Sequence, residues 1–313
     1  MAVATIACFA RSLHARRRRR SSWDDAGGRD PVSVAAPQAV LLRRVADETR
    51  VRDAARRAAV ALGRALVLAL FLGSWAFASG RWMDRQFVSD PRGVLEAFQG
   101  LVASGRLWPN LLQTLSEVLA GYAVGATLGI LLAVLLAVAD RAHRILRPFL
   151  IAFYSIPKIA LAPLIIMWFG LGTAPKVILA AAFVFFVVFM NMAAGVFSVN
   201  ADLVRLVHVM GAGRRDLLWK VTLPSSVPYL MTGLRLAIPE ALIGAVIGEF
   251  ISANRGLGYL VNSAASQFNT AATLAAIVAL LLIVVIMDVG VSLGERRLLR
   301  WRPGNAATSM ARG

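Results

Sequence analysis

The chain has 313 residues, of which 58% are hydrophobic and 16% are charged, and its mean hydropathy is +0.67. Soluble domains carry about 25% charged residues, so this composition excludes an ordinary soluble protein and indicates a polytopic membrane protein. The formal charge of +17 does not indicate a nucleic-acid partner, because the arginines gather in the first 57 residues and beside apolar blocks. The single Cys8 excludes an internal disulfide and a cysteine metal cluster.

Residues 1–57 are predicted to form a basic cytoplasmic tail. The apolar residues 1–10 are too short to span a membrane, and the arginines Arg16 to Arg20 follow them, which is the reverse of a secretory signal. Residues 21–36 are rich in Ser, Asp, Gly and Pro, a composition typical of disorder. Residues 43–57 are expected to form a basic amphipathic segment at the cytoplasmic membrane surface. Its positive charge has two interpretations, a solvated cationic tail and specific lipid recognition.

Six apolar blocks are long enough to cross the hydrocarbon, which takes about 20 residues of helix. They are residues 58–79, 111–138, 148–170, 176–199, 226–251 and 271–293. After the first block, Asp90-Pro91 marks a turn, and an amphipathic pattern then predicts an interfacial helix outside the membrane. The sequence therefore predicts an all-α polytopic membrane protein with six transmembrane helices, followed by a basic tail at 294–313.

The arginines of the connections predict the orientation. They are frequent in 140–147, in 200–224 and in the tail, whereas 171–175 has none and 252–270 has only Arg255. This asymmetry places both termini and the loop 200–224 in the cytoplasm. The segment 80–110 is an exception to this asymmetry, because it carries arginines on the side predicted to be external. Acidic residues in the segment partly balance these arginines, and the other connections agree on the orientation.

The loop 200–224 interrupts two strongly apolar blocks and is expected to form two short helices. Asn200 or Asp202 can cap the first helix, and Gly211 ends it. One face of this helix is apolar, with the spacing i, i+3, i+4, i+7: Leu203, Leu206, Val207 and Met210.

The second helix of the loop is expected to begin around Arg214. Asp216 lies four residues before Lys220, an orientation that favours an ion pair on a helix, and Pro224 marks where the pattern bends or restarts. Its apolar side consists of Leu217, Leu218 and Val221.

Prolines interrupt the third apolar block. Pro148 opens it, and Pro157 and Pro163 lie inside it, so we expect a broken or kinked helix. Irregular backbone at membrane depth persists only where protein or a water-filled path covers it. Residues 153–172, including Pro157 and Pro163, are therefore a candidate pathway segment. Lys158 and Lys176 are expected to lie near helix ends, from which their ammonium groups snorkel to the interface.

Two carboxylates lie inside the fifth block. Glu240 is expected near mid-membrane and Glu249 near the outer end, and intramembrane carboxylates are functional candidates by default. The alternatives are a packed, protonated side chain for Glu240 and an interfacial position for Glu249. In the last block, Asp288 is expected to pair with a neighbour or with the basic tail.

Glycines repeat every four residues in the second block. Gly121, Gly125 and Gly129 share one helix face and predict a close helix contact. A subunit interface and packing within the chain both explain this spacing.

The chain contains no nucleotide-binding motif. Its three lysines follow Pro or Trp and never Gly, which excludes a P-loop. No histidine has a metal-ligand neighbour at useful spacing, and no nucleophile elbow is present. If this protein moves a solute actively, another chain must hydrolyse the ATP.

These features resemble the permease subunits of bacterial ABC importers. Gly211, followed after nine residues by Val221-Thr222-Leu223-Pro224, is similar to the permease loop of that family, although Arg205-Leu206-Val207 occupy the positions of its Glu-Ala-Ala signature. Asp202, one turn earlier, is a possible substitute for the missing glutamate. The segments 156–172 and 232–261 are similar to the nitrate, sulfonate and taurine branch of this family. The resemblance covers about residues 107–293. The basic tail 1–57 and residues 58–106 lie outside it.

The resemblance implies a type I importer permease fold and a set of partners. The chain would pair as a homodimer in the bacterial inner membrane, without a cofactor of its own, because ATP and magnesium bind a cytoplasmic ATPase dimer. A periplasmic or lipid-anchored binding protein would deliver a sulfonate, taurine, nitrate or a vitamin precursor such as a thiamine-type pyrimidine. The ATPase would contact Asp202, Arg205, Leu206, Val207, Gly211, Ala212, Arg214, Arg215, Val221, Leu223 and Pro224.

A second interpretation is a proton-coupled secondary transporter that uses Glu240 and Glu249, and a third is a membrane scaffold or receptor. A secondary transporter would show inverted repeats and would work without an ATPase. An ATPase gene and a binding-protein gene beside this one would favour the importer.

Overall fold

The computed structural model describes residues 35–82, 84–252 and 254–298. The predictions for Cys8, for the arginines at 16–20 and for the end of the basic tail lie outside these residues. The chain divides into two units, Met1–Phe71 and Leu72–Gly313. Helix α2 (Ala35–Ala78) runs through both the predicted basic lead-in and the first span, whose apolar part is Ala58–Ala78.

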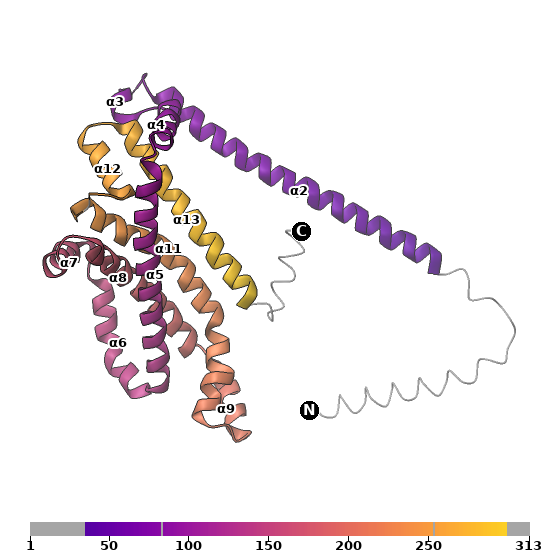
Figure 1. The fold of residues 1–313 in the computed structure, drawn as a ribbon. Helices are drawn as coiled ribbons and strands as arrows, with labels where there is room; N and C mark the ends of the chain where they lie inside the picture. Colours follow the sequence, from indigo (N-terminus) through magenta and orange to yellow (C-terminus); the bar gives the residue numbers. More distant parts are fainter. Residues whose placement is uncertain (1–34, 83, 253, 299–313) are drawn as a thin grey trace. The chain divides into compact units, whose positions relative to one another are not determined.

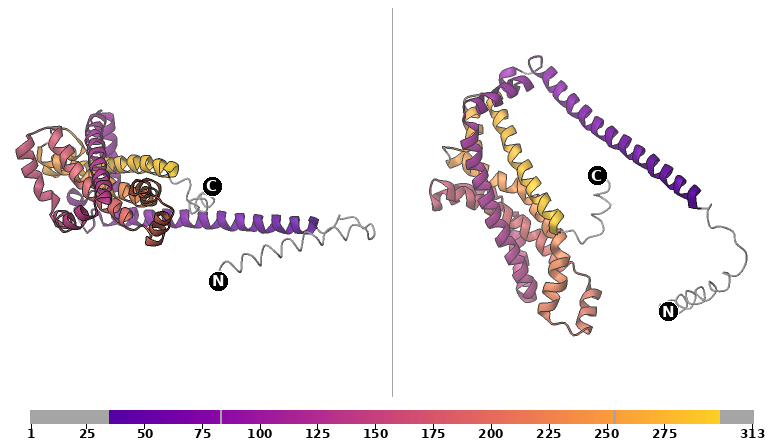
Figure 2. Two further views of the ribbon diagram at one scale, coloured as in Figure 1. Left: turned by 90° about the horizontal axis from the view of Figure 1, so that it is seen from below. Right: turned by 45° about the vertical axis from the view of Figure 1, so that its right-hand side comes forward.

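The second unit is built on four long helices. They are α5 (Leu107–Val138), α8 (Thr173–Phe197), α11 (Leu223–Ser252) and α13 (Thr270–Leu298), drawn in Figures 1 and 2. Helix α8 packs extensively against both α5 and α11. Among the described residues, five helices including the end of α2 are long and apolar enough to cross a membrane, or six if one bent pair counts as a span.

Glycines let α8 approach its two neighbours closely. A Cβ on Gly129 of α5 would lie 2.9 Å from the backbone oxygen of Phe185 in α8, and one on Gly244 of α11 would lie 2.7 Å from the Cα of Ala180. Gly121 and Gly125 meet α8 in the same way. The glycine repeat therefore serves packing within the chain, which is one of the two explanations that the sequence left open.

The third apolar block is broken, as its prolines predict. Helix α6 (Asp140–Ser155) ends before Pro157, and a 3₁₀ turn (Lys158–Leu161) then leads into α7 (Ala162–Phe169). The two halves are bent by 83°. The block is thus a bent pair of helices instead of one straight span.

Short helices cover the end of the bundle that carries α12. Helix α3 (Arg85–Val88) precedes α4 (Pro91–Ala103), which Asp90 caps by accepting a hydrogen bond from the Gly93 backbone N–H (3.2 Å). The predicted amphipathic helix is thereby confirmed, and it packs against α13. Helix α12 (Leu257–Ser266) was not predicted, since the sequence analysis treated 252–270 as a simple connection.

Ion pairs connect α11 and α13 toward the end of the bundle that carries α9. The guanidinium group of Arg235 lies 3.4 Å from Asp288 and 2.7 Å from Glu295, and it also donates to the Ser292 hydroxyl (2.9 Å). Asp288 thus pairs with a neighbouring helix, which is one of the two predicted arrangements.

Candidate functional site

Helix α9 (Ala201–Val209) is the first helix of the loop 200–224 and lies at the end of the bundle opposite α12 (Figure 1). The Asn200 side chain accepts a hydrogen bond from the backbone N–H of Asp202 (2.8 Å). Asn200 is therefore the cap, and Asp202 lies in the first turn, where its charge is favourable.

Gly211 ends α9 in the conformation that its residue type suggests. Its φ is +84°, a left-handed backbone that side chains with a Cβ adopt at a cost. The Gly211 N–H donates to the His208 carbonyl (3.0 Å), and the Ala212 N–H donates to the Val207 carbonyl (3.2 Å). This pair of bonds is a Schellman motif, so the sharp turn after α9 depends on glycine.

The second predicted helix begins at Arg214, as expected, but it does not end before the fifth span. Helix α10 (Arg214–Leu217) passes through a π-helical turn (Leu218–Thr222) into α11. Asp216 and Lys220 form the predicted ion pair, at 2.7 Å. Pro224 follows the π-helical turn and is the second residue of α11.

The loop exposes a large apolar surface. Three residues of the predicted face, Leu203, Leu206 and Met210, are exposed together with Val209, whereas Val207 is half-buried. The face of the second helix is half-buried, and Asp202, Arg205 and Arg215 are exposed. Exposed apolar residues that gather on one element mark a surface for a partner.

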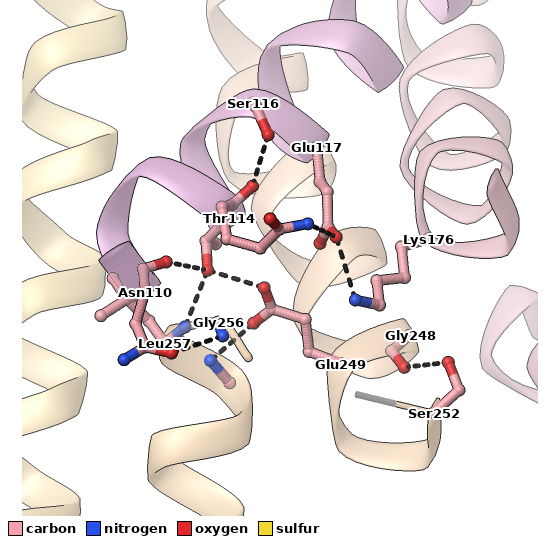
Figure 3. Close-up of polar contacts among 12 residues, drawn as sticks. Asn110, Thr114, Ser116, Glu117, Lys176, Gly248, Glu249, Ser252, Gly256 and Leu257 are labelled. Carbon is pink, nitrogen blue, oxygen red and sulfur yellow. Dashed lines mark hydrogen bonds and ion pairs between the residues drawn. The ribbon is translucent and has the colours of Figure 1, made fainter. Parts of the chain in front are cut away.

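A buried polar cluster lies at the opposite end of the bundle and caps α12 (Figure 3). The first backbone N–H groups of a helix have no partner within the helix. Here three side chains from α5 and α11 accept them: Asn110 from Gly256 (2.7 Å), Thr114 from Leu257 (2.8 Å) and Glu249 from Gly258 (2.6 Å).

Glu249 is the centre of this cap. Its side chain is 1% exposed, and it also accepts a hydrogen bond from the Thr114 hydroxyl (2.7 Å). A carboxylate at a helix N-terminus gains from the helix dipole. Gly256, with φ +121°, and Gly258 leave room for it, because a Cβ on either residue would collide with the Glu249 carboxylate. Glu249 is therefore buried within the protein, close to the end of α11.

A buried ion pair adjoins the cap. The ammonium group of Lys176 on α8 lies 2.9 Å from Glu117 on α5, and the two side chains are 6% and 0% exposed. The prediction that Lys176 snorkels is therefore wrong. Gln113 donates a second hydrogen bond to the same Glu117 oxygen (2.7 Å). The sequence analysis missed Glu117, although the rule that singled out Glu240, a carboxylate inside an apolar block, applies equally to it.

The four predicted pathway residues do not meet at one place. Pro157 and Pro163 are exposed at the break between α6 and α7, and Glu240 is half-buried in α11. Nine residues of helix, about 13 Å, separate Glu240 from Glu249. Among the described residues, no group of three His, Cys, Asp or Glu side chains is placed to hold a metal ion.

Comparison with known proteins defines the class. The fold is similar to that of the MetNI methionine ABC transporter in an inward-facing conformation, with a TM-score of 0.50, 19% identity, and coverage of 63% of this chain and 95% of that one. The chain thus has the all-helical fold of a type I importer permease.

Sequence comparison then gives the family. The profile of the "binding-protein-dependent transport system inner membrane component" matches residues 125–300. The riboflavin transport permease RibX of Chloroflexus aurantiacus is 39% identical over 253 residues, with 80% of this chain and 94% of RibX covered. The putative aliphatic sulfonates transport permease SsuC of Escherichia coli is 35% identical, with 73% and 88% covered.

The chain therefore belongs to this family, and the predicted resemblance to ABC importer permeases is confirmed. It is a multi-pass inner-membrane protein and the permease component of an importer that depends on a binding protein and on an ATPase. ATP hydrolysis belongs to a separate chain.

Proposed function

We propose that residues 107–293 form the translocation pathway for a small solute and that the loop 200–224 docks on a cytoplasmic ATPase. The observation that carries this proposal is the exposed apolar surface of α9, held by the Schellman turn at Gly211. Both termini would then face the cytoplasm. Two copies of the chain would pair with an ATPase dimer, which binds the ATP and magnesium, and a periplasmic or lipid-anchored binding protein would deliver the solute.

The connection between the loop and the bundle supports a mechanical role. Helix α10 continues through the π-helical turn into α11, so a displacement of the loop is passed directly to a helix that packs along α8. Single π turns inside helices are frequent at functional sites. Arg205 holds the place of the missing signature glutamate, and the exposed charged residues Asp202, Arg205 and Arg215 would face the ATPase.

The relatives suggest the class of solute. Their names specify riboflavin, aliphatic sulfonates, formylaminopyrimidine (a 37% identical permease of Halalkalibacterium halodurans) and taurine (a 30% identical permease of Escherichia coli). We infer a small solute: a sulfonate, taurine, nitrate or a vitamin precursor. A binding screen on the cognate binding protein, with these solutes, would choose among them.

The docking proposal is tested by Gly211→Val with Gly213→Val as the matched control. A β-branched residue at φ +84° costs about 1–3 kcal/mol, whereas Gly213 has neither a positive φ nor an atom within 4 Å of an added Cβ. We expect Gly211→Val to insert into the membrane but to lose the ATPase on co-purification, and Gly213→Val to keep it. Retention of the ATPase and of uptake by Gly211→Val would sink the assignment.

A further inference from the structure

Lys158 lies at the break between α6 and α7 and faces three aromatic rings. Its ammonium nitrogen is 4.9 Å from the ring centre of Tyr154, 5.3 Å from that of Phe183 and 5.6 Å from that of Phe186. All three distances are within the range of cation–π interactions. The rings therefore fix where the positive charge lies.

That position is close to the middle of the membrane-spanning part. Phe183 and Phe186 flank the centre of α8, and the ten residues 173–182 before them make about 15 Å of helix. The charge is thus far from both ends of α8.

No carboxylate neutralises this charge among the described residues. Lys176 and Lys220 each have an acidic partner, but no ion pair in the described part of the chain includes Lys158. Helices α8 and α11 run antiparallel, with Gly233 against Asn191 and Gly244 against Ala180. These contacts place Glu240 at the same depth as the ammonium group of Lys158. No described ion pair joins Glu240 to Lys158. A lone cation at mid-membrane is costly in lipid, and such residues face the bundle interior or a water-filled cavity.

The backbone beside Lys158 leads to the same conclusion. The helix is interrupted between Ser155 and Lys158, and the bend of 83° exposes Pro157. Irregular backbone at this depth occurs only where protein covers it or where it lines a water-filled cavity. The Lys158 ammonium group and the interrupted, exposed backbone at Pro157 lie at the same point, and both indicate a water-filled path.

We propose that Lys158, with Tyr154, Phe183 and Phe186, forms an anion subsite in the translocation pathway. It takes the sulfonate or carboxylate group of the solute, which supplies the countercharge that the chain lacks. The rings hold the ammonium group in place and shield it from lipid. This inference rests on the proposed transport function and narrows it to anionic solutes. A subsite with a single cation binds an anion weakly, and weak binding suits a pathway that the solute must leave.

The three lysines of the chain provide the test. The permease–ATPase complex in nanodiscs, nucleotide-free and ATP-bound, is acetylated with sulfosuccinimidyl acetate, and the rate at each lysine is measured by peptide mass spectrometry. Lys220 is exposed but belongs to the proposed docking loop, so it is the internal reference for salt and reagent effects only between samples of the same nucleotide state, with and without probe. Buried Lys176 stays unlabelled while the protein is folded. The probe is methanesulfonate, and its neutral analogue dimethyl sulfone is the matched control.

We expect Lys158 to be labelled in at least one nucleotide state and to be protected by methanesulfonate alone. At about 100 mM probe and a dissociation constant of about 50 mM, the ratio of the Lys158 rate to the Lys220 rate falls about threefold. A Lys158 that is unlabelled in both states lies on no water-filled path, and one that is labelled but unprotected binds no anion. Either result overturns the proposal.

The test is separable from the docking proposal. Co-purification of the ATPase reports docking and does not involve Lys158, and the labelling can also be performed on the permease alone in nanodiscs. A permease that loses the ATPase but keeps the protection would refute docking only, whereas the reverse would refute the anion subsite only.

Discussion

Replacing Lys176 by methionine should destabilise the protein by about 3–5 kcal/mol, the cost of removing one partner from a buried ion pair. The structure places this pair in that class, because the side chains of Lys176 and Glu117 are 6% and 0% exposed. The loss comes mainly from the Glu117 carboxylate, which stays buried without its cation. The hydrogen bond from Gln113 remains and offsets part of the cost.

A double variant separates the charge from the packing. In Lys176→Met/Glu117→Gln neither charge is buried, so we expect it to regain most of the stability, because buried ion pairs and neutral groups of similar shape are often close in free energy. The single Glu117→Gln variant leaves a buried lysine and should be destabilised as strongly as Lys176→Met.

Thermal unfolding of the purified protein in detergent measures these effects. At about 2 °C of Tm for each kcal/mol, each single variant should melt about 6–10 °C below the wild type, and the double variant should lie close to it. A Lys176→Met variant with the wild-type Tm, or a double variant as unstable as the sum of the singles, would refute the ion-pair explanation.

Four further substitutions probe the packing and the ion pairs, each by its change in Tm. Gly256→Ala should be strongly destabilising, because its φ is +121° and the added Cβ collides with Glu249; a wild-type Tm would show that α12 is not capped as described. Gly125→Ala should lower the stability by about 1–3 kcal/mol, because the added Cβ overpacks against α8. Gly290→Ala is the control: nothing lies within 4 Å of its added Cβ, so its stability should stay the same or rise by up to about 1 kcal/mol. Equal effects of the two substitutions would contradict the close contact at Gly125. Arg235→Ala should cost only about 0–1 kcal/mol, because its ion pairs are partly exposed, and a large loss would mean that the connection between α11 and α13 matters more.

The span pattern was readable from the sequence because bilayer thickness dictates long apolar blocks. The ends of α5, α8, α11 and α13 lie within about four residues of their predicted blocks at most positions, and the proline break and the end of α9 at Gly211 were also predicted. Each of these depends on local chemistry: an apolar run, a missing N–H or a left-handed glycine.

The buried polar cluster could not be predicted, because it depends on contacts between distant segments. Glu117 meets Lys176 across 59 residues of sequence, and Thr114 meets Glu249 across 135. Without that pairing, Lys176 looks like a snorkelling residue and α12 looks like a loop. The proposed anion subsite could not be predicted for the same reason, since the rings around Lys158 come from two helices.

Cross-linking from α9 tests the central claim, ATPase docking, most directly. In a background with Cys8→Ser, a cysteine is placed at Met210, which is 77% exposed beside Gly211, or at Trp82, which is 82% exposed near the opposite end of the bundle. A bifunctional thiol reagent should join the Met210→Cys variant to the ATPase and leave the Trp82→Cys variant unlinked. An ATPase that co-purifies with both variants but cross-links to neither, or only to Trp82→Cys, would contradict docking through this loop.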